Sequence, residues 1–190
     1  MKLQIVNSYT KNKVIEFNSK LYTNGRRLLD PKARIECVAV DFSDANNTVT
    51  VLHNLDPQIV SVLTEMIIQQ RIDFFKSGFS EQKINVYKKM NDKYFVSKFT
   101  IKYNEKMNNP WNIVIENGKG DMDKKENGLV NIKNYEEDKK VSLFLSNIEM
   151  LKIAIALKDF INAFKIVHMR EVLQQTKNDK TQQNVKVMQK

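Results

Sequence analysis

The sequence contains few of the residues that build covalent or metal-bound sites. Its 190 residues include one cysteine, Cys37, and two histidines, His53 and His168. A single cysteine cannot form a disulfide within the chain, and such usage is typical of a reducing compartment. A zinc site needs several ligands at close spacing, which one cysteine and two distant histidines do not provide. We therefore expect a cytoplasmic protein with no metal and no cofactor.

Long apolar runs are absent as well. No segment approaches the ~18 apolar residues of a membrane span, and the start, MKLQIVNSYT, lacks the apolar stretch of a signal peptide. Glycine-rich phosphate loops are also missing, because Gly118-Lys119-Gly120 lacks the required spacing, and we interpret it as a flexible turn. We expect no contact with a membrane.

No group of residues predicts catalysis. Cys37 lies in a segment that is apolar on both faces, where a buried and inert thiol is the usual finding. Asp121, Asp123 and Glu126 lack the regular ligand frame of a cation-binding loop and are interleaved with lysines. We expect a protein that is not an enzyme, and an enzyme that uses Cys37 is the alternative.

Positive charge is the main surplus. The net charge is +9 and is unevenly distributed, because residues 1–34 carry +6, residues 83–106 carry +5 and residues 35–82 carry −5. A clustered basic excess suggests a polyanionic partner. The alternative is that lysine is common throughout the chain and that each lysine is simply solvated.

The alternation of apolar and polar residues predicts an α+β fold. Asp56-Pro57 predicts the start of a helix that runs to about Lys76, and Ser146-Asn147 predicts the cap of a second, long helix that ends near Leu173. The segment GKGDMDKKEN (118–127) is expected to be a polar loop. Strands are expected at 3–9, 13–22, 34–42, 48–53, 94–103, 111–116, 128–133 and 139–145, with 80–92 either a strand or a short helix.

The order of these elements predicts two similar halves. The stretches TVTVLHNLDPQIVSVL and KKVSLFLSNIEMLKIA each consist of an alternating strand, a polar cap and an aliphatic helix. We infer a tandem repeat of an antiparallel β-sheet followed by a long helix, with halves 1–78 and 79–175 in one compact domain. The polar tail 176–190 lacks a periodic apolar face and is expected to be disordered.

The second helix is apolar around more than half of its circumference. A one-sided surface helix needs an apolar stripe of only about 100°. The excess predicts that the helix 147–173 packs both in the core and at the interface of a homo-oligomer. The alternative is that it is buried wholly within one chain.

Lysines and aromatic residues are interleaved along several expected strands. Proteins hold single-stranded nucleic acid through cations that contact phosphates and aromatic faces on which bases stack, each worth ~1–3 kcal/mol. The alternatives are core packing for each aromatic residue and solvation for each lysine. Phe95, Phe99 and Ile101 are expected to face the core, and Lys98 and Lys102 a ligand. The candidate nucleic-acid-binding residues are Lys13, Lys20, Tyr22, Arg26, Arg27, Lys88, Lys89, Tyr94, Lys98, Lys102, Tyr103 and Trp111.

Two tandem strand-then-helix units with basic sheets resemble the Whirly family and the smaller positive-cofactor-four coactivator domain. The segment SKFTIKYNEKMNNPWNIVIENGKG (97–120) is similar to coactivator-like proteins of bacterial phages and plasmids. The lysine-rich strand that is the signature of plant Whirly proteins is not found. The resemblance implies single-stranded DNA binding on the sheet faces, with little base specificity, and oligomerisation through the helices. It would put Lys98, Lys102 and Trp111 on or beside the binding path.

Three kinds of partner are therefore considered. Single-stranded DNA is favoured. An RNA-binding regulator would use the same surface, and the sequence does not separate the two. A protein-interaction module would instead place its basic strands against an acidic protein.

Overall fold

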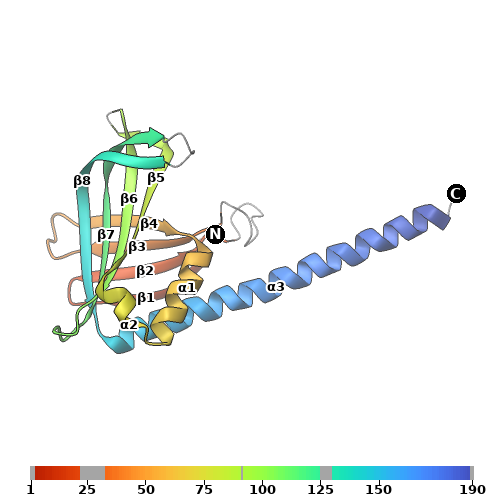
Figure 1. Cartoon of the computed structure of the whole chain (residues 1–190), viewed down its shortest axis with the longest axis horizontal. Helices are drawn as coiled ribbons and strands as arrows, with labels where there is room; N and C mark the ends of the chain where they lie inside the picture. Colours follow the sequence, from red (N-terminus) through yellow and green to blue (C-terminus); the bar gives the residue numbers. More distant parts are fainter. Residues whose placement is uncertain (1–2, 22–32, 91, 125–129, 189–190) are drawn as a thin grey trace.

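The computed structural model describes residues 3–21, 33–90, 92–124 and 130–188. These residues form an α+β fold of two four-stranded antiparallel sheets and three helices. In Figure 1 the strands of the first sheet run across the picture and those of the second run up it, so the two sheets cross at a large angle. None of the described helices is long and apolar enough to span a lipid bilayer.

The first sheet lies where the alternation of residues predicted it. Its strands, in spatial order, are β1 (Leu3–Tyr9), β2 (Lys13–Ser19), β3 (Ile35–Asp41) and β4 (Val49–Leu55). Strand β2 ends earlier than the expected residue 22. Phe17, Cys37 and His53 are aligned across β2, β3 and β4 and are buried. Burial raises the pKa of the Cys37 thiol well above its ordinary value, so this cysteine is a poor nucleophile.

The helix expected from Pro57 to Lys76 is two helices, α1 (Pro57–Ile68) and α2 (Ile72–Lys76). The predicted cap is confirmed, because the Asp56 side chain accepts a hydrogen bond from the backbone N–H of Gln58 at 2.8 Å. Two residues after the end of α1, the chain turns at Gln70, whose φ of 55° is left-handed. The N–H groups of Gln70 and Arg71 donate to the carbonyls of Ile67 and Met66, which closes the helix end.

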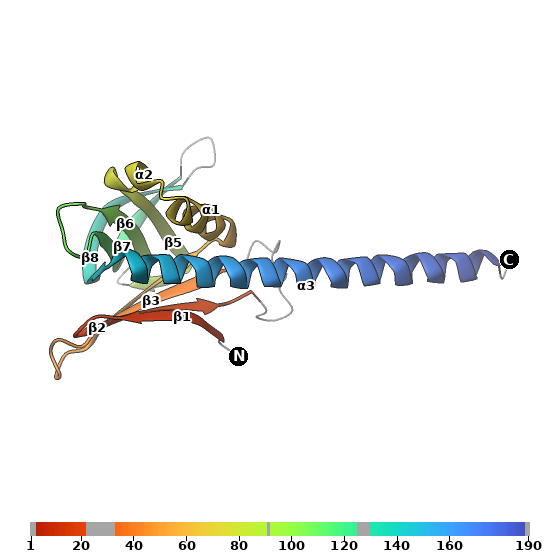
Figure 2. The ribbon, with the colours of Figure 1, turned by 90° about the horizontal axis from the view of Figure 1, so that it is seen from below.

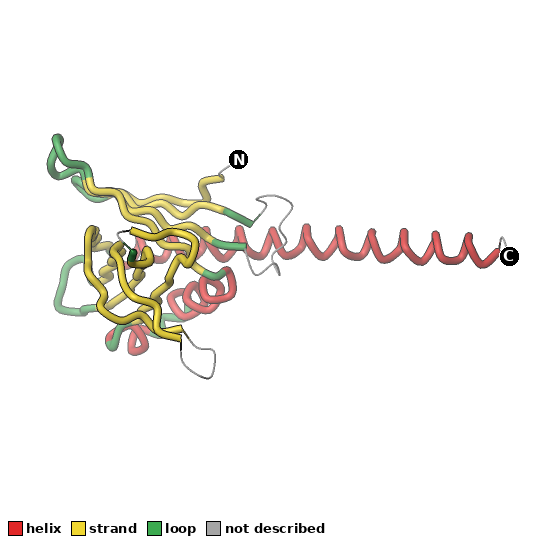
Figure 3. Tube along the Cα trace, turned by 90° about the horizontal axis from the view of Figure 1, so that it is seen from above, coloured by secondary structure: helices red, strands yellow, loops and turns green. Residues whose placement is uncertain are grey.

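The second sheet has longer strands than expected. They are β5 (Phe79–Met90), β6 (Lys93–Tyr103), β7 (Trp111–Lys124) and β8 (Val130–Leu145), again in sequential order. The segment 80–92, which was left open, is mostly strand. The expected loop 118–127 is wrong over its described part, because β7 continues through Lys124, and Figure 3 shows how strongly these strands curl.

Gly118 and Gly120 lie inside β7 and do not form the expected turn. A Cβ atom at Gly118 would lie 2.1 Å from the backbone oxygen of Glu136, and one at Gly120 would lie 2.7 Å from Cγ2 of Ile132. The pairing of β7 with β8 shifts register on both sides of this stretch. The two glycines therefore let the far half of β8 cross close over β7, which curls the sheet.

The long helix α3 (Asn147–Met188) begins as predicted and ends later. The Ser146 N–H donates to the Glu149 carboxylate at 2.8 Å, and the Glu149 N–H donates to Ser146 Oγ at 3.2 Å, which is a capping box. The expected end at Leu173 is wrong, and helix covers most of the tail 176–190 that was expected to be disordered. No proline or glycine interrupts this stretch, so nothing local stops the helix.

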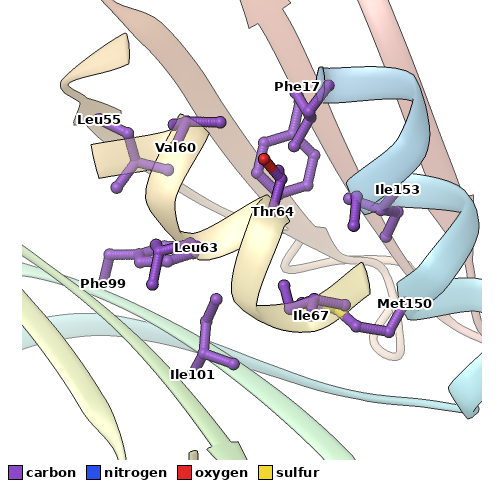
Figure 4. A pocket seen from close by; sticks show the side chains of 12 residues that line it. Phe17, Leu55, Val60, Leu63, Thr64, Ile67, Phe99, Ile101, Met150 and Ile153 are labelled. Atoms are coloured by element: carbon purple, nitrogen blue, oxygen red, sulfur yellow. The ribbon is translucent and has the colours of Figure 1, made fainter. Parts of the chain in front are cut away.

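The first part of α3 packs between α1 and the first sheet, whereas the rest projects away from the sheets (Figures 1 and 2). One hydrophobic core joins both sheets with α1 and α3. Figure 4 shows its centre, where Phe17, Leu63 and Ile153 meet around a cavity of ≈ 20 Å³. A space of this size is enough for about one water molecule and too small for an organic ligand.

Candidate nucleic-acid interface

The structure removes Trp111 from the predicted binding residues. Its ring is 4% exposed and packs edge-on against Phe75 and Tyr103 at centroid distances of 5.1 and 5.0 Å. Its Nε1 donates a hydrogen bond to Asn147 Oδ1 at 2.9 Å. A ring enclosed in this way has no face on which a base could stack. Tyr103 is half-buried and belongs to the same aromatic cluster.

The candidate lysines of the first sheet are engaged with carboxylates of that sheet. Lys13 forms an ion pair with Asp41 at 3.1 Å and donates to the backbone oxygen of Ser142 at 3.0 Å. Lys20 forms an ion pair with Glu36, which is only 6% exposed. Their charges are therefore largely used within the fold. Tyr22, Arg26 and Arg27 lie outside the described residues.

Three candidate lysines of the second sheet lie over aromatic rings. The Nζ atoms of Lys88, Lys89 and Lys98 lie 4.5, 5.4 and 3.5 Å from the ring centroids of Phe95, Tyr94 and Tyr135, respectively. Among the described residues no carboxylate forms an ion pair with these lysines or with Lys102. Cation–π contact orders an ammonium group without neutralising its charge. These lysines therefore remain available to an anion.

The predicted core side of β6 is confirmed for Phe99 and Ile101, whereas Phe95 lies on that side but outside the core. Phe99 and Ile101 are buried, and Lys102 is exposed on the opposite face. Lys98, on the face of Lys102, is partly covered because β8 brings Tyr135 over it. Burial raises the pKa of Tyr135 to about 12, so the ring is a neutral platform for the lysine. Phe95 was expected in the core and is instead half-buried at the edge of an open groove.

This groove lies between the edge strand β4 of the first sheet and strands β5 and β6 of the second. Its volume is ≈ 500 Å³, within the range of ligand sites in proteins. We call it the inter-sheet groove. It is lined by Arg34, Leu52, Asn54, Gln82, Lys83, Ile84, Asn85, Phe95 and Ser97. No sequence signal marked it, because it exists only where two crossed sheets diverge.

A buried histidine links the two sheets below the groove. His53 Nδ1 lies 3.0 Å from Ser97 Oγ, and His53 Nε2 lies 3.4 Å from a Glu81 oxygen. Glu81 also pairs with Lys83 at 2.9 Å, and Lys83 donates to the backbone oxygen of Asn54. This chain of contacts joins β4 to β5 and β6. It fixes the distance between the two walls of the groove.

The electrostatics of this link follow from burial. Burial lowers the pKa of His53, so its ring is neutral near pH 7. Burial on its own raises the pKa of Glu81, but the hydrogen bonds from His53 and Lys83 outweigh it and leave that pKa below its ordinary value. Glu81 is therefore ionised and balances Lys83 at the groove wall.

Ser97, His53 and Glu81 are the residue types of a serine-hydrolase triad, but their burial argues for a structural role. A nucleophile must come within about 3 Å of a substrate carbonyl. Ser97 is 6% exposed and His53 is fully buried, stacked on Phe99 at 5.8 Å. Among the described residues no group of three or more His, Cys, Asp or Glu side chains could hold a metal ion.

No protein-family model matches the chain, and no curated protein matches it significantly in sequence. The interpretation of the site therefore depends on its geometry. The geometry offers uncompensated lysines beside aromatic rings and a groove with cationic and amide walls.

Proposed function

We propose that this protein binds single-stranded nucleic acid, with single-stranded DNA favoured, and that it is not an enzyme. The observation that carries the proposal is the placement of Lys88, Lys89 and Lys98 over aromatic rings rather than against carboxylates. Lysines that keep their charge can contact phosphates, and the rings beside them can contact bases. Such binding needs no reading of base edges, so we expect little sequence specificity.

The element order supports the resemblance to the Whirly and positive-cofactor-four families. Four antiparallel strands precede α1 and α2, and four more precede α3. We propose on this basis that the chain is a Whirly-like tandem repeat with halves 1–78 and 79–175. Its sheets would carry the nucleic acid, as the resemblance implies.

We further propose that α3 is the interface of a homo-oligomer. On its outer surface Ile148, Leu151 and Ile155 are 67%, 40% and 44% exposed. These residues are spaced three and four apart and form one exposed apolar stripe on α3, and a stripe of this kind is typical of protein interfaces. Sedimentation velocity should show an oligomer that Ile155→Glu dissociates and that Asn47→Glu, an exposed polar position in the turn between β3 and β4, leaves intact. A monomeric wild type would contradict this part of the proposal.

Fluorescence anisotropy tests the binding function. A labelled oligo-dT of about 16 nucleotides is titrated at about 50 mM and about 200 mM salt. We expect affinity at low salt that falls steeply at high salt, because phosphate neutralisation releases counterions. Absence of binding at low salt would contradict the proposal and favour a protein-interaction module. Competition by the matched RNA oligonucleotide decides between DNA and RNA as the preferred partner.

A further inference from the structure

We propose that the inter-sheet groove holds a single unstacked base of the bound strand, with Phe95 as the stacking platform and the amides of Asn54, Gln82 and Asn85 beside the base edge. The inference rests on the proposed function and adds to it a site at which one base is contacted individually. Without such a site, the protein would contact the nucleic acid only through its phosphates and through non-specific contacts with exposed aromatic rings.

Phe95 is the residue that makes the groove fit a base. It points to the same side of β6 as Ser97 and Phe99, which are 6% and 1% exposed because β4 covers them. Phe95 lies one step beyond that cover, so its ring is half-buried and lines the groove. A base can stack on a partly exposed aromatic ring at the edge of the core without any rearrangement of the core residues.

The groove walls carry amide groups rather than apolar side chains alone. Asn54 from β4 faces Gln82 and Asn85 from β5 across the groove. The side-chain oxygen of Asn54 is buried and has no hydrogen-bond partner among the described residues. A buried acceptor without a hydrogen-bond partner destabilises the folded chain. Rotation of the Asn54 side chain toward the groove would let this oxygen accept a hydrogen bond from an N–H group of a base edge.

The charges at the groove rim match a nucleotide rather than an apolar ligand. The Lys88 ammonium group lies over one face of the Phe95 ring, so a base stacks on the other face or displaces this group, and in either case Lys88 stays close to the backbone of the bound nucleic acid. Arg34 lines the opposite side and forms a long ion pair with Asp56, at 3.9 Å. Lys83 is already balanced by Glu81 and contributes less. A base in the groove thus has cations on both sides of its backbone.

The experiment compares two ligands and three proteins by anisotropy at low salt. One ligand is oligo-dT, and the other is the same sugar-phosphate backbone with its central bases removed. The proteins are the wild type, Phe95→Ala and a matched control, Phe42→Ala. Phe42 is 42% exposed and follows β3 at the end of the first sheet away from the groove. Removing bases keeps every phosphate, so any difference between the ligands reports on base contacts.

For the wild type and Phe42→Ala we expect the abasic ligand to bind about 10-fold more weakly, the range expected for one stacked base. Phe95→Ala should bind oligo-dT about as weakly as the wild type binds the abasic ligand, and should distinguish the two ligands much less than the wild type does. Phe95→Trp preserves an aromatic face and should retain the distinction, which separates loss of stacking from loss of folding.

Equal affinity of the wild type for both ligands would overturn the inference while leaving the binding function intact. The same holds if Phe95→Ala still distinguishes the ligands as the wild type does. Absence of binding to either ligand would overturn the binding function as well. A second variant, Asn54→Ala, tests the amide contacts: we expect it to change the ratio of affinities for oligo-dT and oligo-dA by about 3-fold or more, and an unchanged ratio contradicts the role of Asn54.

Discussion

The lysines of the two sheets make different contacts, although the two basic segments carry similar net charge. Residues 1–34 carry +6 and residues 83–106 carry +5. In the first sheet Lys13 and Lys20 face Asp41 and Glu36, so their charges are spent within the fold. In the second sheet Lys88, Lys89 and Lys98 lie over rings that leave their charge uncompensated.

This difference shows that a basic segment is not by itself a binding surface. A lysine paired with a half-buried carboxylate contributes to folding, whereas a lysine over an aromatic ring is ordered and still cationic. The second sheet is not free of ion pairs, because Lys119 pairs with Glu136 and Lys140 with Glu116. The contrast is therefore between particular lysines, and substitutions can test it one pair at a time.

The substitution with the largest expected effect disturbs the curl of the second sheet. Gly118→Ala places a methyl group 2.1 Å from the backbone oxygen of Glu136, a contact that only a shift of β8 can relieve. We expect a loss of about 3 kcal/mol in the free energy of unfolding, measured by urea denaturation. Gly120→Ala should cost less, because its closest contact, at 2.7 Å, is a side-chain methyl group of Ile132 rather than a backbone atom. Equal costs at the two positions would contradict this account of the sheet.

The next effect concerns affinity. Lys88→Glu combined with Lys89→Glu should weaken binding of oligo-dT at low salt by about 10- to 100-fold and lower the salt dependence by about 1.4 in log–log slope, because two phosphate contacts are lost. The control is Lys11→Glu combined with Lys106→Glu, which changes the net charge equally at exposed positions in the β1–β2 and β6–β7 turns. If the control weakens binding as much, only total charge matters.

A stability effect should mark the first sheet instead. Lys20→Gln removes one ion pair of Glu36, whose side chain is largely buried. We expect a loss of about 1–2 kcal/mol in the free energy of unfolding and a change in nucleic-acid affinity of less than about 3-fold. Urea denaturation and anisotropy on the same sample measure both. A large loss of affinity with unchanged stability would reverse the proposed division between the sheets.

The smallest effect is a dependence of stability on pH through His53. Burial lowers the pKa of His53 in the folded state, so the unfolded chain binds a proton first as pH falls below about 6.5. The free energy of unfolding is therefore independent of His53 titration above that pH. It declines as pH falls from there to the lower pKa that His53 has in the folded state. We expect His53→Gln to be less stable at about pH 7.5 yet to lose less between about pH 7.5 and about pH 5.5 than the wild type. An equal loss in both proteins would show that His53 does not titrate as described.

Local features were predictable from the sequence because they depend on neighbouring residues. The cap of α1 by Asp56 and the capping box of Ser146 and Glu149 follow from side chains within three residues of the helix start. The strands of the first sheet follow from alternation. The end of α1 was missed because Gln70, rather than glycine or asparagine, takes the left-handed conformation.

The site was only partly predictable because it depends on distant segments. The position of Lys88, Lys89 and Lys98 among aromatic residues predicts them as binding residues. The sequence does not show that Lys13 and Lys20 form ion pairs among the described residues and that these three do not, because this depends on where carboxylates lie in three dimensions. Alternation places Phe95 on the core side of β6, yet it cannot show where the cover of β4 ends. The polar composition of 118–124 predicts a loop, whereas the glycines in this stretch leave space for β8 to pass close to β7.

Hydrogen–deuterium exchange of the full-length protein, with and without saturating oligo-dT, tests the central claim most directly. We predict that bound oligo-dT slows amide exchange in β5 and β6 around residues 83–97 and at the end of β4. Exchange in β2 and β3 should stay unchanged. Protection confined to β1–β3 or to α3, with none along β5 and β6, would contradict the claim that the second sheet is the binding surface.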